Sequence, residues 1–267
     1  MKKYSLQYLI DSIAKQDSLS VIVAGSKENP VFPLENPDIF VGAHGGIFHA
    51  DRFPETTLKI GVISNWMLFS QATYCDTVRF LVRDVRLDFL IVVESIQNKF
   101  EDISPSSFVR LNSSSVLRLS PFKCSLLEFK FLWPEYFACL FSGISVLKLM
   151  GFALQLLTER TTYLTRLSTG MFCVLYFYHL LPSKSRIYVS GIGLQLSGSY
   201  FFDPSSKMQK GGHYSQDIFI ANKLIHRPSA SNLCVEFTDS EALELLAELS
   251  NVPFVHFFNQ YLSSIAR

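Results

Sequence analysis

The chain is long enough for one large domain or two small ones, and its composition excludes two classes of protein. Its 267 residues are 48% apolar, 14% aromatic and only 18% charged, so a sizeable core is expected and intrinsic disorder is excluded. The formal net charge of +1 gives no electrostatic case for a nucleic-acid partner, because phosphate binding needs a basic excess or a basic stripe.

The cysteines and the apolar runs indicate where such a chain works. The five cysteines are widely separated and form no CxxC pair, which argues against structural zinc and favours a reducing compartment. The first 18 residues have the period of an amphipathic helix but carry Asp11, so they do not predict a signal peptide. We therefore expect a cytoplasmic protein.

A phenylalanine-rich stretch near the middle of the chain is a candidate membrane span. Its clean apolar run, residues 136–147, has about a dozen residues, whereas a bilayer span needs about 20. A helix over residues 134–160 is therefore expected to be buried or to lie on the inner face of a membrane as a peripheral contact.

Short apolar runs that end in small or polar residues predict a parallel β-sheet. Such runs end in Gly, His-Gly-Gly or Ser-Asn, as the strands of open α/β sheets do where ligands approach the backbone. The predicted strands are residues 20–26, 38–43, 58–63, 89–94 and 187–191.

Together with helices predicted over residues 71–83 and 168–181, these strands favour a Rossmann-like α/β fold. We expect a doubly wound, mainly parallel sheet with helices on both faces and a helical insertion. One domain would span residues 1–267. Its core would cover about 18–98 and 160–230, with an insertion at about 99–159, a loop at 195–212 and a C-terminal helix at 239–266 capped by Ser240.

Glycine and hydroxyl residues follow the first predicted strand. Gly25, Ser26 and Lys27 form a turn whose backbone N–H groups can approach a phosphate. The segment is neither a Walker loop nor a GxGxxG motif. A plain turn between a strand and a helix is an equal interpretation of these three residues.

The helix predicted at 168–181 opens on Ser168, Thr169 and Gly170. A helix N-terminus with two hydroxyls and a glycine can bind a carboxylate or a phosphate. A helix cap without a ligand is the alternative.

The third candidate segment is polar and glycine-rich. Gly211 and Gly212 allow a close approach of the backbone to a ligand, and His213 has a pKa suited to general-base chemistry. Asp217 lies one helical turn later and is expected either to orient the imidazole or to lie beside it on one face of a helix. A structural histidine is the alternative.

The order of these segments resembles the sialyltransferase family. Val21 to Lys27, followed by Asn36 to His44, is similar in layout to the large motif of that family. Leu167-Ser168-Thr169-Gly170, with the helix and strand that follow, is similar to the small motif. Tyr200-Phe201-Phe202-Asp203 and then His213 with Asp217 correspond to the third and last motifs.

The resemblance implies an inverting glycosyltransferase that uses a CMP-activated 2-keto acid sugar, either sialic acid or Kdo. His213 would be the base, with Asp217 beside it. The acceptor would be either a free glycan or a lipid-linked glycan. No metal or other cofactor is implied. The donor-binding residues would be Gly25, Ser26, Lys27, His44, Gly45, Asn65, Ser168, Thr169, Gly170, Gly191 and Gly212.

The chain also departs from the family pattern. His44 stands where the family has asparagine, and Leu167 replaces a proline. For His44, a donor contact and a packing role are equally favoured. The alternatives to a transferase are a non-catalytic module that binds a nucleotide sugar and a scaffold on the membrane periphery.

Overall fold

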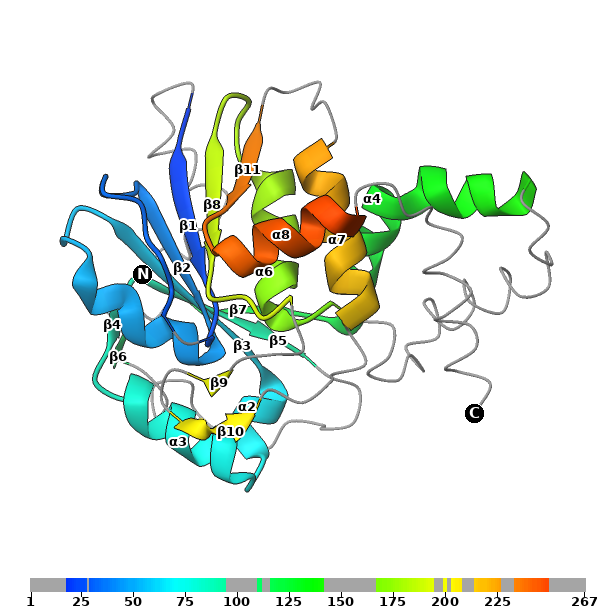
Figure 1. Cartoon of the computed structure of the whole chain (residues 1–267). Helices are drawn as coiled ribbons and strands as arrows, with labels where there is room; N and C mark the ends of the chain where they lie inside the picture. The colour runs from blue at the N-terminus through cyan, green and yellow to red at the C-terminus, as the bar shows by residue number, and fades with distance from the viewer. Residues whose placement is uncertain are drawn as a thin grey trace.

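The computed structural model describes residues 18–27, 29–94, 110–111, 116–141, 167–194, 199–200, 203–207, 214–226 and 233–249. These residues form a three-layer α/β fold, in which one sheet lies between two layers of helices (Figure 1). The sheet has seven strands in the order β11-β8-β1-β2-β3-β5-β7, and every neighbouring pair is parallel. The predicted Rossmann-like doubly wound fold is confirmed.

The central strands are apolar because both faces of the sheet are covered. β1 and β2 are almost entirely buried, and their β-branched residues suit a pleated, two-sided core. The strands of the large sheet are β1 (Ser20–Ala24), β2 (Ile39–Ala43), β3 (Leu58–Ser64), β5 (Phe89–Val93), β7 (Val116–Leu119), β8 (Arg186–Ser190) and β11 (Cys234–Phe237).

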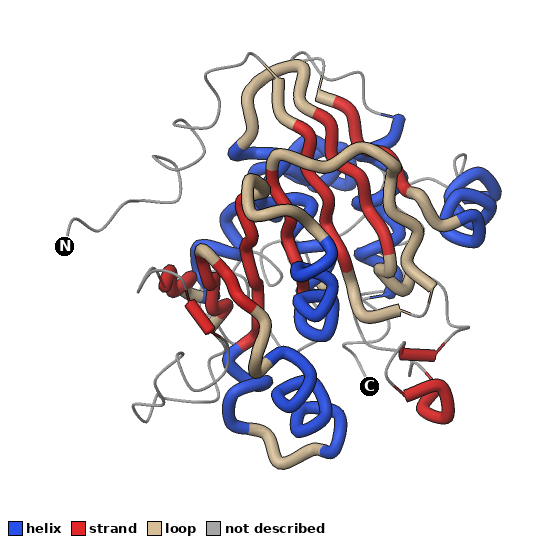
Figure 2. The backbone as a smooth tube through the Cα atoms, turned by 90° about the vertical axis from the view of Figure 1, so that its left-hand side faces the viewer, coloured by secondary structure: helices blue, strands red, loops and turns tan. Residues whose placement is uncertain are grey.

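Alternate residues of each strand enter two separate cores. Val21 and Val23 pack under the layer that contains α6, whereas Ile22 and Ala24 pack under the layer that contains η1. Figure 2 shows the strands side by side with helices on both sides.

The first layer holds α4 (Pro121–Phe141), α6 (Thr169–Leu180), α7 (Tyr214–His226) and α8 (Ser240–Leu249). The second holds η1 (His44–Arg52), α2 (Asn65–Phe69) and α3 (Thr73–Val82).

Some elements differ from the sequence prediction. β7 and β11 belong to the large sheet although neither was predicted, and β7 lies in the segment assigned to the insertion. Each has only four residues, the shortest length at which an alternating pattern indicates a strand. α4 begins earlier than predicted. The predicted 195–212 loop contains the β-ladder of β9 (Ser199–Tyr200) with β10 (Asp203–Lys207), and β4 (Arg86–Leu87) pairs with β6 (Arg110–Leu111).

The path of the chain creates a topological switch point between β1 and β8. From β1 the chain moves outward through β2, β3, β5 and β7, and then returns to the opposite side of β1 with β8 and β11. Open α/β sheets bind ligands at such a point, outside the carboxyl ends of the strands. The edge that contains residues 25–27 and 191 is therefore where a ligand is expected to bind.

Several predicted features lie outside the described residues. They include the N-terminal helix, most of the 134–160 helix, the end of the C-terminal helix, and the Gly211, Gly212 and His213 segment. Within the part of the chain that the structure describes, no helix combines the length and apolarity needed to cross a membrane.

Candidate functional site

The turns after β1 and β8 meet at the switch point. The Gly25 backbone N–H donates to Ser190 O and the Lys27 N–H donates to Gly191 O, both at 2.8 Å. Gly191 has a φ of +65°, which favours glycine. A Cβ on Gly25 would lie 2.2 Å from Gly191 O. The predicted donor residues Gly25 and Gly191 are thus in direct contact, and each position requires glycine for a steric reason.

Two carboxylates from the start of α8 complete this part of the edge. Glu241 Oε2 lies 2.5 Å from Lys27 Nζ. Asp239 Oδ2 accepts the Gly191 N–H at 2.9 Å, and its Oδ1 accepts from Ser190 Oγ at 3.4 Å. The Lys27 cation, predicted to face a phosphate, is therefore bound to a carboxylate in this structure.

The sequence prediction did not include these carboxylates among the site residues. Asp239-Ser240-Glu241 suggested only a helix start, with Ser240 as cap. In the structure Ser240 is the first residue of α8, and the Leu243 N–H donates to Asp239 O, so Asp239 occupies the cap position. Glu241 lies 214 positions from Lys27 in the sequence, and no local pattern signals such a pair.

His44 and Asn65 lie at the ends of β2 and β3. His44 Nε2 accepts the Ser64 N–H at 3.3 Å, with the His44 backbone at a φ of +50°. Burial lowers the pKa of His44 to about 4, so this imidazole is neutral at physiological pH. Of the two roles left open for His44, the observed contact is a packing one that joins β2 to β3.

The neighbouring predicted residues are also buried. Asn65 is the first residue of α2 and is fully buried, and Gly45 lies in η1. Ser26 Oγ donates to Ala43 O at 3.4 Å, which links the β1 turn to the end of β2. A Cβ on Gly46 would lie 2.2 Å from Ala24 O. η1 therefore packs directly on the end of β1.

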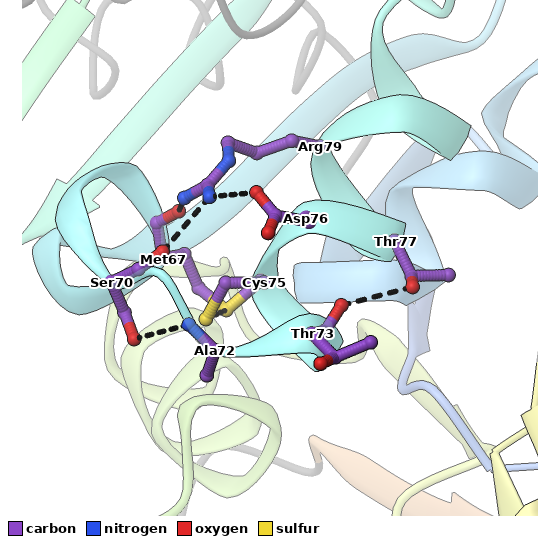
Figure 3. Close-up of polar contacts among 8 residues, drawn as sticks. All are labelled: Met67, Ser70, Ala72, Thr73, Cys75, Asp76, Thr77 and Arg79. Carbon is purple, nitrogen blue, oxygen red and sulfur yellow. Dashed lines mark hydrogen bonds and ion pairs between the residues drawn. The ribbon is translucent and has the colours of Figure 1, made fainter.

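An arginine holds the short helix that begins at Asn65. Arg79 of α3 donates to the carbonyl oxygens of Met67 at 2.7 Å and Ser70 at 2.8 Å, and pairs with Asp76 (Figure 3). The last carbonyl groups of a helix have no partner within the helix. Arg79 thus fixes the corner between α2 and α3 and, with it, the position of Asn65.

The Ser168-Thr169-Gly170 segment forms the N-terminus of α6, as predicted. Ser168 Oγ accepts the Met171 N–H at 3.2 Å, so the predicted cap is confirmed. A Cβ on Gly170 would lie 3.1 Å from the side chain of Ile192. Because Ile192 follows the turn after β8, the N-terminus of α6 lies at the same edge of the sheet as Gly191.

Asp217 of α7 contacts this helix start. Its Oδ1 accepts the Ser168 backbone N–H at 2.9 Å, and its side chain is buried. Burial raises the pKa of Asp217 to about 7, although hydrogen bonds from Ser168 oppose the rise. The carboxyl predicted to orient His213 is therefore bound to the turn predicted to hold the donor, and it titrates near neutrality.

The structure gathers the described candidates along one edge in three groups: residues 25–27 with Gly191, His44 and Gly45 with Asn65, and residues 168–170 with Asp217. Gly212 and His213 lie outside the described residues. No cluster of three or more His, Cys, Asp or Glu able to hold a metal occurs in the described ranges. No family model, curated protein or solved structure matches the chain.

Proposed function

We propose that the protein is a CMP-sugar-dependent glycosyltransferase that moves a 2-keto acid sugar, sialic acid or Kdo, to a glycan acceptor. One observation carries the proposal: the 2.9 Å hydrogen bond from the Ser168 N–H to Asp217 Oδ1. It joins the two segments assigned to donor binding and catalysis, which lie 49 positions apart. In the sequence His213 immediately precedes the first residue of α7.

Anion binding is assigned to the N-terminus of α6. The first turn of a helix carries a partial positive charge and backbone N–H groups that attract a phosphate or a carboxylate. Thr169 and Gly170 open α6 at the carboxyl edge of a parallel sheet. They would hold the sugar carboxylate or the phosphate, while Gly25 and Ser26 face the nucleotide.

His213 would take the proton of the acceptor hydroxyl as that oxygen attacks the anomeric carbon. The bond from this carbon to the phosphate oxygen breaks, CMP leaves with the bonding electron pair, and the configuration inverts. Asp217 is a positioning residue in this scheme, because its carboxyl contacts Ser168.

Glu241 competes with a phosphate for the Lys27 ammonium group. The Glu241 side chain is 55% exposed, whereas that of Lys27 is 10% exposed, so Glu241 is the partner that can move into solvent. The variant Glu241→Gln is therefore expected to bind CMP more tightly than the wild type, and Lys27→Met less tightly. Isothermal titration with CMP measures both affinities, and equal affinities in all three proteins would remove Lys27 from the donor site.

The central test is turnover without added metal. The protein is incubated with CMP-N-acetylneuraminic acid or CMP-Kdo, and CMP release is measured for wild type, His213→Ala and His226→Ala. His226 ends α7 and is exposed, so it is the matched control. We expect a loss of about 100-fold or more for His213→Ala, unchanged CMP-induced thermal stabilisation, and full activity for His226→Ala.

Two outcomes would contradict the proposal. Absence of both turnover and CMP-induced stabilisation would exclude the CMP-sugar site. CMP binding without transfer, indifferent to His213, would instead identify a non-catalytic module that binds a nucleotide sugar.

A further inference from the structure

One face of α4 combines exposed apolar side chains with lysines. Leu126 is 52% exposed, Phe129 42% and Trp133 53%, and Lys123 and Lys130 are exposed beside them. At 3.6 residues per turn, these five positions fall within an arc of about 120° on the helix. The lysines form one border of the arc, and the apolar residues form the remainder.

The opposite face of α4 is fixed to the protein core. Phe131 and Leu132 are fully buried, and Lys223 of α7 donates to Phe131 O at 3.4 Å. Glu128 is buried and accepts the Leu167 N–H at 3.2 Å. The exposed face is therefore held at a set orientation. Figure 1 shows α4 extending sideways beyond α6 and α7.

The charge and the apolar character of this face favour one kind of binding partner, an anionic membrane. The described exposed residues of α4 include two lysines and no acid, and a stripe of Leu, Phe and Trp bordered by lysine is typical of helices that lie in the interface of an anionic bilayer. A symmetric contact between two copies would bring the lysines of both into one interface. Lys123, Glu128, Lys130 and Glu135 make a span through the bilayer unfavourable.

We propose that the exposed face of α4 docks the protein onto an anionic membrane surface, with Phe129 and Trp133 inserted at the headgroup level. Lys123 and Lys130 contact the lipid phosphates. Glu128, on the opposite face of the same helix, accepts the N–H of Leu167, the residue before Ser168, so the docked helix is joined to the N-terminus of α6. The inference stands independently of glycosyl transfer.

Co-sedimentation with vesicles tests the docking without any nucleotide. We expect binding to phosphatidylcholine vesicles that contain phosphatidylglycerol, and at least about tenfold weaker binding after Phe129→Ser with Trp133→Ser. The matched control is Phe80→Ser, because Phe80 is 79% exposed on α3, in the layer on the other side of the sheet. The control is expected to bind as wild type does.

The contribution of the lysines to vesicle binding is tested with a double variant and a matched control. Lys123→Glu with Lys130→Glu is expected to weaken binding to the anionic vesicles by about tenfold or more. Arg83→Glu with Arg86→Glu makes the same change in net charge at two exposed residues of the opposite layer, and is expected to have a much smaller effect. If both double variants lose the same amount of vesicle binding, the attraction depends on the net charge of the protein alone. That result would overturn the assignment of docking to α4.

A fluorescence measurement reports insertion directly. The chain has two tryptophans, so Trp66→Phe leaves Trp133 as the single reporter. Anionic vesicles are expected to shift its emission to the blue and to make it accessible to brominated lipids. Three results would each overturn the proposal: an unchanged emission spectrum, no sedimentation of the wild type with vesicles, or self-association that depends on Trp133. Thermal melting is measured for every variant to confirm that it is folded.

Discussion

Asp239 and Asp217 lie at the same edge of the sheet and make nearly the same hydrogen bond, yet their pKa values are raised to different extents. Each carboxylate accepts a backbone N–H at 2.9 Å, from Gly191 and Ser168 respectively. Burial raises the pKa of both. For Asp239 the hydrogen bond from Gly191, the nearby Lys27 charge and the hydrogen bond from Ser190 oppose the rise, whereas for Asp217 only the hydrogen bonds from Ser168 do, and its pKa reaches about 7.

The difference follows burial, because Asp217 is buried and Asp239 is only half-buried, so removal from water raises the pKa of Asp217 further. The region of β1, β8 and β11 is interlocked by a charge pair and two glycines. The junction of α6 and α7 instead holds an acid that can change its charge near neutral pH. Three pairs of substitutions test this contrast.

Asp217→Asn should have the largest effect, and it should depend on pH. The native carboxyl keeps its proton up to about pH 7, whereas the unfolded chain releases it near pH 4. The stabilisation from this group is therefore complete below pH 4 and is lost as the pH rises to about 7. We expect wild type to lose up to about 4 kcal/mol relative to Asp217→Asn between pH 4 and pH 8.

Urea unfolding at several pH values measures this difference, with Asp239→Asn as the comparison. Because Lys27 offsets part of the burial at Asp239, the pH-dependent gap for Asp239→Asn should be smaller. Parallel stability curves for wild type and Asp217→Asn would show that Asp217 is ionised throughout and would remove the contrast.

Gly25→Ala and Gly170→Ala should differ in free energy of unfolding. A Cβ on Gly25 would meet backbone atoms of Gly191, whereas on Gly170 it would meet only the Ile192 side chain. We expect a loss of about 3 kcal/mol for Gly25→Ala. For Gly170→Ala we expect a change within about 1 kcal/mol, because alanine also favours the helix. Equal losses in chemical denaturation would contradict the interlocked switch point.

Glu241→Gln should have the smallest effect on stability. Glu241 is half exposed, so solvent screens its attraction to Lys27, and the expected loss is about 1 kcal/mol or less. Glu244→Gln, at another exposed position of α8, is the control and should leave thermal stability unchanged. High salt should reduce the difference in thermal stability between the two variants. A difference that does not change with salt would argue against a charge pair.

The sequence by itself determined the five central strands at 20–26, 38–43, 58–63, 89–94 and 187–191, the helices over 71–83 and 168–181, and the cap at Ser168. These features are encoded locally. β-branched runs favour buried strands, and a hydroxyl side chain can cap the N–H groups that begin a helix.

The tertiary structure alone decided the partners of the charged residues and the two short strands. Lys27 contacts Glu241, which lies 214 positions away in the sequence, and Asp217 contacts Ser168, which lies 49 positions away. These contacts form because the chain returns past β1 to form β8 and β11. β7 and β11 have four residues each, and parallel pairing of β7 with β5 and of β11 with β8 makes them members of the sheet. Asp217 was expected to orient His213, and its contact with Ser168 follows from the packing of α7 beside α6, which no spacing in the sequence encodes.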